Sequence, residues 1–192
     1  VIENFNRQVV DEVRENEDLE VIKNSIRTIP NFPKPGIMFR DITTLLKDKE
    51  GLNKVISILE KRYKDQKIDV IAGIESRGFI IGGILASKLN TSFVPIRKQG
   101  KLPAETISKT YELEYGTDTI EIHRDAILPE QKVLIIDDLI ASGGTALASC
   151  KLIERLQGKI YEIAFVIGLP ELKGKEKLKD YNVFTMIEFE EE

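Results

Sequence analysis

The segment of this sequence best suited to chemistry places two adjacent carboxylates before a run of small residues. Residues 133–145 read VLIIDDLIASGGT, an apolar run followed by Asp137 and Asp138 and then by a short loop. Neighbouring like charges repel and consecutive glycines cost backbone entropy, which points to a ligand outside the chain. Carboxylates suit the vicinal hydroxyls of a sugar, directly or through a divalent cation.

The loop after the carboxylates is suited to bind a phosphate. It consists of Ala141, Ser142, Gly143, Gly144 and Thr145 and lies between a predicted strand and a predicted helix. Backbone N–H groups and a helix N-terminus then face one anion, and small residues let them approach it. We expect Thr145 to cap the helix and to donate its hydroxyl. The loop is not a Walker A loop, because the G-K-[ST] ending is missing. A phosphate site next to carboxylates that suit a diol indicates a phosphorylated ribose. The alternative is a tight strand–helix turn.

Polar residues also follow two other predicted strands. The stretch IDVIAGI at 68–74 is short, apolar and β-branched, and it precedes Glu75-Ser76-Arg77. The stretch TSFVPIRK at 91–98 ends in Arg97-Lys98. Ligands of open α/β sheets bind beyond the carboxyl ends of the strands, so the three polar segments should converge on one site.

The remaining periodicity predicts an α/β domain with a central, mainly parallel sheet flanked by helices. Alternation in TYELEY and TIEIH around Gly116 indicates a hairpin or a mobile flap within 99–131. Strands are also predicted at 133–137 and 160–169. Helices are predicted from Leu19 to Pro30, around 52–59, from the turn at 76–78 to Leu89, and at 145–156. Residues 188–192, EFEEE, are expected to form a solvated tail.

Composition excludes several classes of protein. The 192 residues carry a net charge of −4, so no global field recruits nucleic acid or an anionic membrane. The only cysteine, Cys150, forms no internal disulfide and favours a reducing compartment, which makes the cytoplasm the expected location. One cysteine and one histidine, His123, argue against a zinc site. No apolar run reaches the roughly 18 residues that cross a bilayer.

The chain is expected to form one domain over 19–192, preceded by an acidic extension. Residues 11–20, DEVRENEDLE, hold six acidic groups and one arginine, which is typical of a solvated helical extension. We therefore assign residues 1–18 to an N-terminal extension.

The motif VLIIDDLIASGGT resembles the phosphoribosyl pyrophosphate motif of type I phosphoribosyltransferases, and its Asp-Asp pair with an A-[ST]-G-G-T ending resembles the adenine-specific members. Other segments resemble the same enzymes in the expected order: FPKPGIMFRDIT (32–43), ESRGF (75–79), VPIRKQGKLP (94–103), LEYG (113–116) and LPELKG (169–174). The resemblance covers about residues 20–190. It implies the type I fold, with a flexible catalytic loop or hairpin and a small hood.

The resemblance also implies an activity. These enzymes transfer ribose 5-phosphate from phosphoribosyl pyrophosphate to N9 of adenine, giving AMP and pyrophosphate in purine salvage. Mg²⁺ is held mainly by the phosphoribosyl pyrophosphate, with water-mediated contacts to Asp137 and Asp138 as the protein's share. The family implies a homodimer and no membrane or nucleic-acid partner.

Residue by residue, the resemblance assigns the two ends of the sugar substrate. The ribose 5-phosphate is expected on Asp137, Asp138 and residues 141–145. The pyrophosphate is expected on Glu75, Ser76, Arg77, Arg97, Lys98 and Lys101. The family also implies a cis peptide between Glu75 and Ser76. Each cation could instead be an ordinary surface charge, and this alternative applies to Lys98 more than to Arg77, which follows a buried strand.

The catalytic loop and the base pocket are assigned on the resemblance alone. Glu114 corresponds to the residue that handles the proton of adenine, Tyr115 closes over the ribose, and Arg77 assists the leaving pyrophosphate. Met38, Phe39, Arg40 and Leu169 are expected to bind adenine, with Phe39 and Leu169 sandwiching the purine. Read without the family, Glu114 would be a solvated strand residue and GIMF a core turn.

Two other functions remain open at this point. A hypoxanthine–guanine enzyme would have Asp or Asn where this chain has Ala141, and a lysine that reads the 6-oxo group. A regulator that binds phosphoribosyl pyrophosphate would add an N-terminal helix-turn-helix and lose the catalytic loop. The short acidic segment before the core disfavours the regulator.

Overall fold

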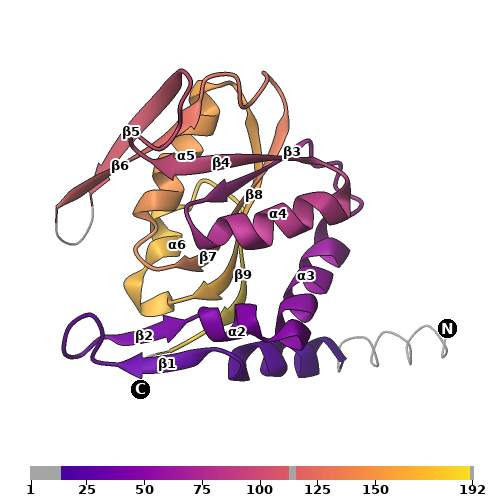
Figure 1. Cartoon of the computed structure of the whole chain (residues 1–192), viewed down its shortest axis with the longest axis vertical. Coiled ribbons are helices and arrows are strands. Elements are labelled where there is room, and N and C mark those ends of the chain that lie inside the picture. The colour runs from indigo at the N-terminus through magenta and orange to yellow at the C-terminus, as the bar shows by residue number, and fades with distance from the viewer. Residues whose placement is uncertain (1–13, 113–115, 191–192) are drawn as a thin grey trace. The chain divides into compact units, whose positions relative to one another are not determined.

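The computed structural model of the protein describes residues 14–112 and 116–190, and the chain divides into two units, residues 1–58 and 59–192 (Figure 1). The larger unit holds a seven-stranded sheet in the order β5-β6-β4-β3-β7-β8-β9. Its strands are β3 (Val70–Ile74), β4 (Ser92–Lys98), β5 (Thr106–Glu112), β6 (Thr117–His123), β7 (Lys132–Ile140), β8 (Lys159–Gly168) and β9 (Val183–Glu188). The five strands from β4 to β9 in this order are parallel, whereas β5 and β6 form an antiparallel hairpin that extends the sheet beyond β4. The expected mainly parallel sheet and hairpin are confirmed.

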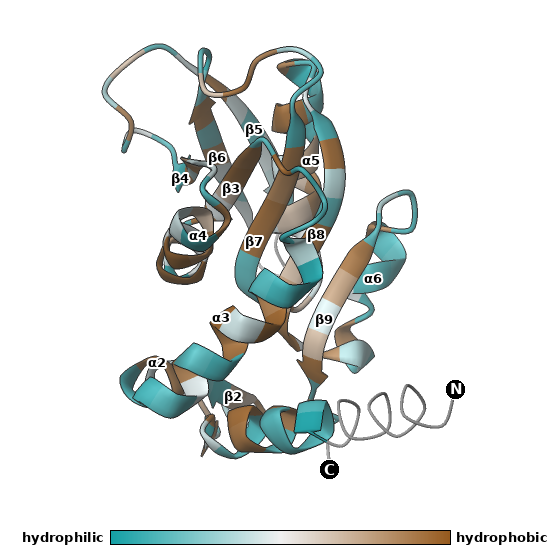
Figure 2. Cartoon of the chain, turned by 90° about the vertical axis from the view of Figure 1, so that its right-hand side faces the viewer, coloured by the Kyte–Doolittle hydropathy of each residue, from teal (hydrophilic) through white to brown (hydrophobic). Residues whose placement is uncertain are grey.

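Helices α4 (Arg77–Leu89) and α5 (Gly144–Arg155) cover opposite faces of this sheet (Figure 2). Helix α4 packs on β3 and β7, and α5 packs on β5 and β8. The chain passes from β3 to β4 in one direction across the sheet and from β7 to β8 in the other. Right-handed crossovers then place the two connecting helices on opposite faces. The 3₁₀ turn η1 (Pro170–Leu172) and helix α6 (Gly174–Lys177) connect β8 to β9.

The core of the larger unit explains why its strands lie where they do. Every residue of β3 is buried, and β7 is buried from Val133 to Ile136 because both strands are covered on two faces. Figure 2 shows the apolar residues continuing along most of β7. Cys150 is fully buried in this core.

The smaller unit contains the other elements. Helical residues 14–24 are followed by β1 (Arg27–Pro30), β2 (Met38–Asp41), α2 (Thr43–Lys47) and most of α3 (Lys49–Tyr63), which continues into the larger unit. Strands β1 and β2 pair antiparallel, with Arg27 opposite Asp41 and Pro30 opposite Met38. Ile22, Ile42, Leu45 and Val55 are among the buried residues of this unit.

The structure corrects three expected elements. The helix predicted to reach Pro30 ends at residue 24, because the chain pairs with β2 and the helical spacing of Ile26 and Ile29 does not reveal that pairing. The segment GIMF is a turn only at its start, because Gly36 lies in a turn whereas Met38 and Phe39 begin strand β2. The acidic terminus is not all solvated tail, because Glu188 ends strand β9 opposite Gly168.

No helix within the described residues has both the length and the apolarity needed to cross a bilayer.

Candidate active site

The loop at residues 141–145 borders a cavity of about 200 Å³ that Asp137, residues 139–146 and Phe165 line. Gly143 adopts a left-handed φ of +76°, and a Cβ atom there would lie 2.5 Å from the carbonyl oxygen of Gly174. Only glycine fits this position, so the loop keeps its close turn against residue 174. The sequence prediction of a strand–loop–helix cradle is confirmed.

Four backbone amides of this loop have no hydrogen-bond acceptor among the described residues. Within the described part of the chain, no oxygen accepts from the N–H groups of Ser142, Gly143, Gly144 or Thr145. The first amides of a helix have no intrahelical acceptor, and here no side chain replaces it. The loop therefore presents successive donors and the N-terminus of a twelve-residue helix to the cavity.

The expected helix cap is wrong. Helix α5 begins at Gly144, Gly143 occupies the cap position, and no side chain caps the helix. Thr145 lies inside the first turn and lines the cavity, and its side chain lies near the Tyr111 hydroxyl of β5. The hairpin therefore reaches the loop, since a Cβ at Gly144 would also lie 3.1 Å from the Glu112 carbonyl oxygen.

Both aspartates lie within β7, which continues to Ile140 past the predicted end of the strand at residue 137. Pairing with β3 stops at Ile136, whereas pairing with β8 continues to Ile140 opposite Gly168. The carboxylates therefore lie where one neighbouring strand has ended and the other still supports the chain. Successive residues of a strand point to opposite sides, which separates their surroundings.

Asp138 and Asp137 accordingly have different partners. The Asp138 side chain is 8% exposed and accepts a hydrogen bond from Nε of Arg77 at 2.5 Å. Asp137 lines the cavity and accepts the amide of Asp138 at 2.8 Å. Burial and the neighbouring charge of Asp138 raise the pKa of Asp137 well above its ordinary value. A cation or a hydroxyl donor in the cavity would stabilise its ionised form.

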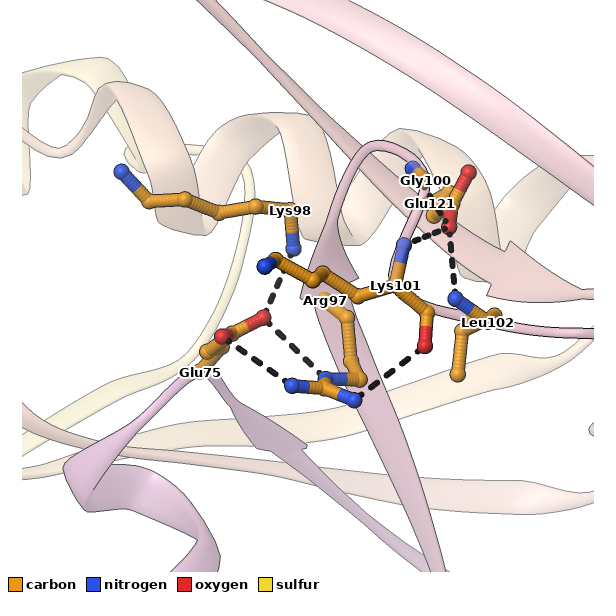
Figure 3. A network of polar contacts seen from close by, with 7 residues as sticks. All are labelled: Glu75, Arg97, Lys98, Gly100, Lys101, Leu102 and Glu121. Carbon is orange, nitrogen blue, oxygen red and sulfur yellow. Dashed lines mark hydrogen bonds and ion pairs between the residues drawn. The ribbon is translucent and has the colours of Figure 1, made fainter.

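The other strand ends form a second polar cluster around Glu75 (Figure 3). Its carboxylate accepts hydrogen bonds from Nε and Nη2 of Arg97 at 3.2 and 3.3 Å and from the amide of Lys98 at 2.9 Å. Burial acts to raise the pKa of Glu75, but these bonds and the charges of Arg97 and Lys101 outweigh it, so the pKa lies below its ordinary range. The expected cis peptide between Glu75 and Ser76 is present.

The two lysines of this cluster point in different directions. The Lys98 ammonium bonds Asp118 at 3.1 Å and leads away from Glu75, whereas the Lys101 side chain extends toward Glu75 (Figure 3). Arg97 and Lys98 are neighbours on β4, so strand alternation accounts for the divergence. Ser76 and Arg77 are exposed at the start of α4.

The remaining predicted site residues belong to other segments of the chain. Glu114 and Tyr115 fall outside the described residues. Met38, Phe39 and Arg40 lie on β2 in the smaller unit, where the Phe39 ring packs edge-on against Phe32 at 5.2 Å.

Leu169 belongs to the larger unit and directly follows β8. It lines a cavity of about 120 Å³. Ala141, Gly174 and Glu188 line the same cavity, which therefore lies beside the loop at 141–145.

Sequence reasoning missed three polar residues of this region: Tyr111, Asp118 and Glu121. Tyr111 contacts Thr145, Asp118 holds Lys98, and Glu121 binds the turn after β4. The alternation in TYELEY and TIEIH around Gly116 predicted the hairpin that holds all three. It gave no sign that Glu121, between two buried isoleucines, is itself only 5% exposed.

Comparison with known proteins identifies the family. Residues 41–192 match the model of the phosphoribosyl transferase domain. A curated adenine phosphoribosyltransferase from Halothermothrix orenii is 59% identical over 167 residues, covering 87% of this chain and 98% of that protein. The chain belongs to the phosphoribosyltransferase family, among the adenine phosphoribosyltransferases.

Solved structures of the family agree with this assignment. Adenine phosphoribosyltransferase from Thermoanaerobacter pseudethanolicus superimposes with a TM-score of 0.86 at 53% identity, covering 89% of this chain and 99% of that chain. The Saccharomyces cerevisiae enzyme, complexed with an imino-altritol bisphosphate and adenine, gives a TM-score of 0.85 at 41% identity, with coverage of 90% and 99%. The expected type I fold is thereby confirmed.

Proposed function

We propose that this chain transfers the 5-phosphoribosyl group from phosphoribosyl pyrophosphate to N9 of adenine, giving AMP and pyrophosphate. The observation that carries the proposal is the open row of amides at 142–145 beside Asp137 in one cavity. Such donors suit a phosphate, and a carboxylate that lines the same cavity suits a ribose hydroxyl. The family membership makes adenine the acceptor.

The ribose 5-phosphate end would bind at this cavity. The amides of 142–145 and the Thr145 hydroxyl would donate to the 5′-phosphate, with Ala141 lining the same turn. Asp137 and Asp138 would accept from the ribose hydroxyls. Asp138 already bonds Arg77, so it would share its two oxygens between the guanidinium and the sugar.

The pyrophosphate end would bind at the cluster around Glu75, Ser76 and Arg77. Arg97 and Lys101 supply positive charge there, and Arg77 stands between this cluster and Asp138. The bond from C1′ to the pyrophosphate oxygen breaks as C1′ gains positive charge, and the leaving group takes the electron pair. Cations held in place before the reaction stabilise that developing charge. Lys98 would contribute once its ammonium exchanges Asp118 for the pyrophosphate.

The base would be held by Met38, Phe39, Arg40 and Leu169. Phe39 and Leu169 would sandwich the purine, and backbone groups of β2 would pair with the 6-amino group and N1. The structure of the yeast relative in complex with adenine supports a base site in this family.

Glu114 would handle the proton at N7 or N9 of adenine when N9 attacks C1′. Tyr115 would close over the ribose with the hairpin of β5 and β6, which would exclude water from the reacting carbon.

Mg²⁺ fits the acidic side of the cavity. Asp137, whose ionised form is disfavoured beside Asp138, would be stabilised by a cation reached through water. The metal, held mainly by phosphoribosyl pyrophosphate, would neutralise charge on the leaving group.

We further propose a homodimer that acts in the cytoplasm, with residues 19–192 as the catalytic domain and 1–18 as an extension. The homodimer rests on the family alone. The low net charge and the single, buried cysteine fit a reducing compartment.

The deciding experiment measures AMP and pyrophosphate formed from phosphoribosyl pyrophosphate and Mg²⁺ with adenine, hypoxanthine or guanine in parallel. We expect product with adenine alone, and loss of most turnover in Glu114→Gln. Product with the 6-oxopurines would overturn the base pocket but not the phosphate site. Binding of the sugar without turnover would instead favour a regulator.

A further inference from the structure

The turn after β4 is held by a single buried carboxylate. Oε1 of Glu121 accepts hydrogen bonds from three successive amides, those of Gly100, Lys101 and Leu102, each at 3.1 Å (Figure 3). The second oxygen accepts from the Thr106 hydroxyl at 3.4 Å. Glu121 lies on β6 directly opposite Arg97 of β4, so the strand pairing delivers the carboxylate to the base of the turn.

This arrangement is an anion site that the protein fills itself. Successive backbone N–H groups form a concave donor set that favours negative charge, and charge-assisted hydrogen bonds are stronger than neutral ones. Glu121 is 5% exposed, so its charge depends on these donors in place of water. The turn is therefore fixed in the shape that serves the carboxylate.

The same turn carries two cations of the proposed pyrophosphate site. The carbonyl of Lys101 accepts a hydrogen bond from Nη1 of Arg97 at 3.2 Å, and the Lys101 side chain extends toward Glu75. Arg97 is thus held on one side by Glu75 and on the other by the anchored turn. Releasing the turn would free both the Lys101 ammonium and one support of the Arg97 guanidinium.

We propose that Glu121 is a positioning residue that places Lys101 and Arg97 for the pyrophosphate end of the sugar substrate. The inference rests on the proposed function. Glu121 does not touch the substrate; it acts through the backbone of residues 100–102. Its removal should weaken binding of the pyrophosphorylated sugar and leave binding of the purine unchanged.

The variants that test it are Glu121→Ala and Glu121→Gln, with Glu162→Gln as the matched control. Glu162, on β8, is also a buried carboxylate and is 8% exposed. It binds Arg62 and Tyr63 of α3 and no residue of the cluster around Glu75. A purely structural effect of losing a buried carboxylate would appear in all three variants. A positioning effect would appear only at residue 121.

We expect Glu121→Ala to raise the KM for phosphoribosyl pyrophosphate by about tenfold or more, the loss expected for hydrogen bonds to a charged group. The KM for adenine should change by less than about twofold. Glu121→Gln keeps one acceptor and should recover part of the loss, and it provides the same comparison if the alanine variant does not fold. In a Lys101→Ala background, the effect of Glu121→Ala should shrink, because the two residues act through one contact.

Hydrogen exchange supplies a readout that does not depend on turnover. The amides of Gly100, Lys101 and Leu102 should exchange faster in both Glu121 variants and not in Glu162→Gln. Calorimetry with pyrophosphate should show weaker binding in the same two variants.

Faster exchange with unchanged pyrophosphate affinity and unchanged KM would overturn the inference. Equal losses for both substrates, or the same loss in Glu162→Gln, would overturn it as well. Absence of AMP formation by the unaltered protein would overturn the proposed function, whereas the pyrophosphate titration would still decide whether Glu121 positions the cations.

Discussion

Two short segments of this protein present consecutive backbone amides, and they differ in what fills them. At 100–102 the amides meet Glu121, a carboxylate from the neighbouring strand. At 142–145 no acceptor comes from the described residues, and the amides face a cavity. Both segments use a glycine at left-handed φ, +80° at Gly100 and +76° at Gly143.

The difference separates structure from binding. A set of amide donors that is satisfied within the chain fixes a turn and thereby positions the side chains of that turn. A donor set left open at a helix N-terminus is available to an external anion. Similar backbone geometry therefore fixes a turn in one segment and is left open to an external anion in the other.

The strongest way to break the open segment is Gly143→Ala. The new Cβ would meet the Gly174 carbonyl oxygen at 2.5 Å, and the left-handed φ adds strain for a residue with a side chain. We expect kcat/KM for phosphoribosyl pyrophosphate to fall by about a hundredfold and the free energy of unfolding by about 2 kcal/mol. Steady-state kinetics and urea denaturation measure the two; unchanged kinetics would show that the loop does not bind phosphate.

Asp137→Asn tests the carboxylate beside the open amides. Burial and Asp138 raise the pKa of Asp137, so ionisation is more favourable in the unfolded chain and folding stability is lost as the pH rises through the folded-state pKa. The asparagine variant should therefore gain in Tm over the unaltered protein from about pH 4 upward, with no gain below the ordinary value of 3.8.

The same variant should lose about 10- to 100-fold in kcat/KM, because a charged acceptor is removed from the ribose. Thermal melts across pH and kinetics at neutral pH check both parts. A lower Tm of the asparagine variant at neutral pH would contradict the raised pKa of Asp137.

Arg77→Gln should have a smaller effect on stability. The variant leaves the Asp138 carboxylate without its guanidinium, but the Arg77 side chain is 46% exposed, so we expect a loss of about 1 kcal/mol. Adding Asp138→Asn should restore stability, as seen in denaturant midpoints, and should not restore turnover. Recovery of turnover in the double variant would show that the two residues serve only each other.

Gly100→Ala should have the smallest effect and sharpens the contrast with Gly143. Nothing lies within 4 Å of the position of its Cβ, so only the left-handed φ is unfavourable, by about 1 kcal/mol. We expect kcat/KM to change by less than about threefold. A loss as large as that of Gly143→Ala would mean that both segments contact the substrate.

The sequence by itself determined most of the central sheet, except strand β9, and the position of the loop at 141–145. Strand β3 is apolar throughout, and β7 and β8 each contain an apolar run, because both faces of a parallel sheet are covered. The loop between β7 and α5 is marked by its small residues. These features are local, so the order of residue types was enough to find them. The two strands of the smaller unit were not found, because β1 and β2 arise from pairing between separated segments.

Only the tertiary structure decided which partner each polar residue has. Asp137 and Asp138 are adjacent in sequence, but strand alternation gives one to the cavity and the other to Arg77. Arg97 and Lys98 are likewise adjacent, and one meets Glu75 while the other meets Asp118. Glu121 is buried against a turn twenty residues earlier in the chain, as the separation from Lys101 shows. Residue type limits what a side chain can bind, but the pairing of distant strands determines which groups it meets, because charge and hydrogen bonding act only over short distances.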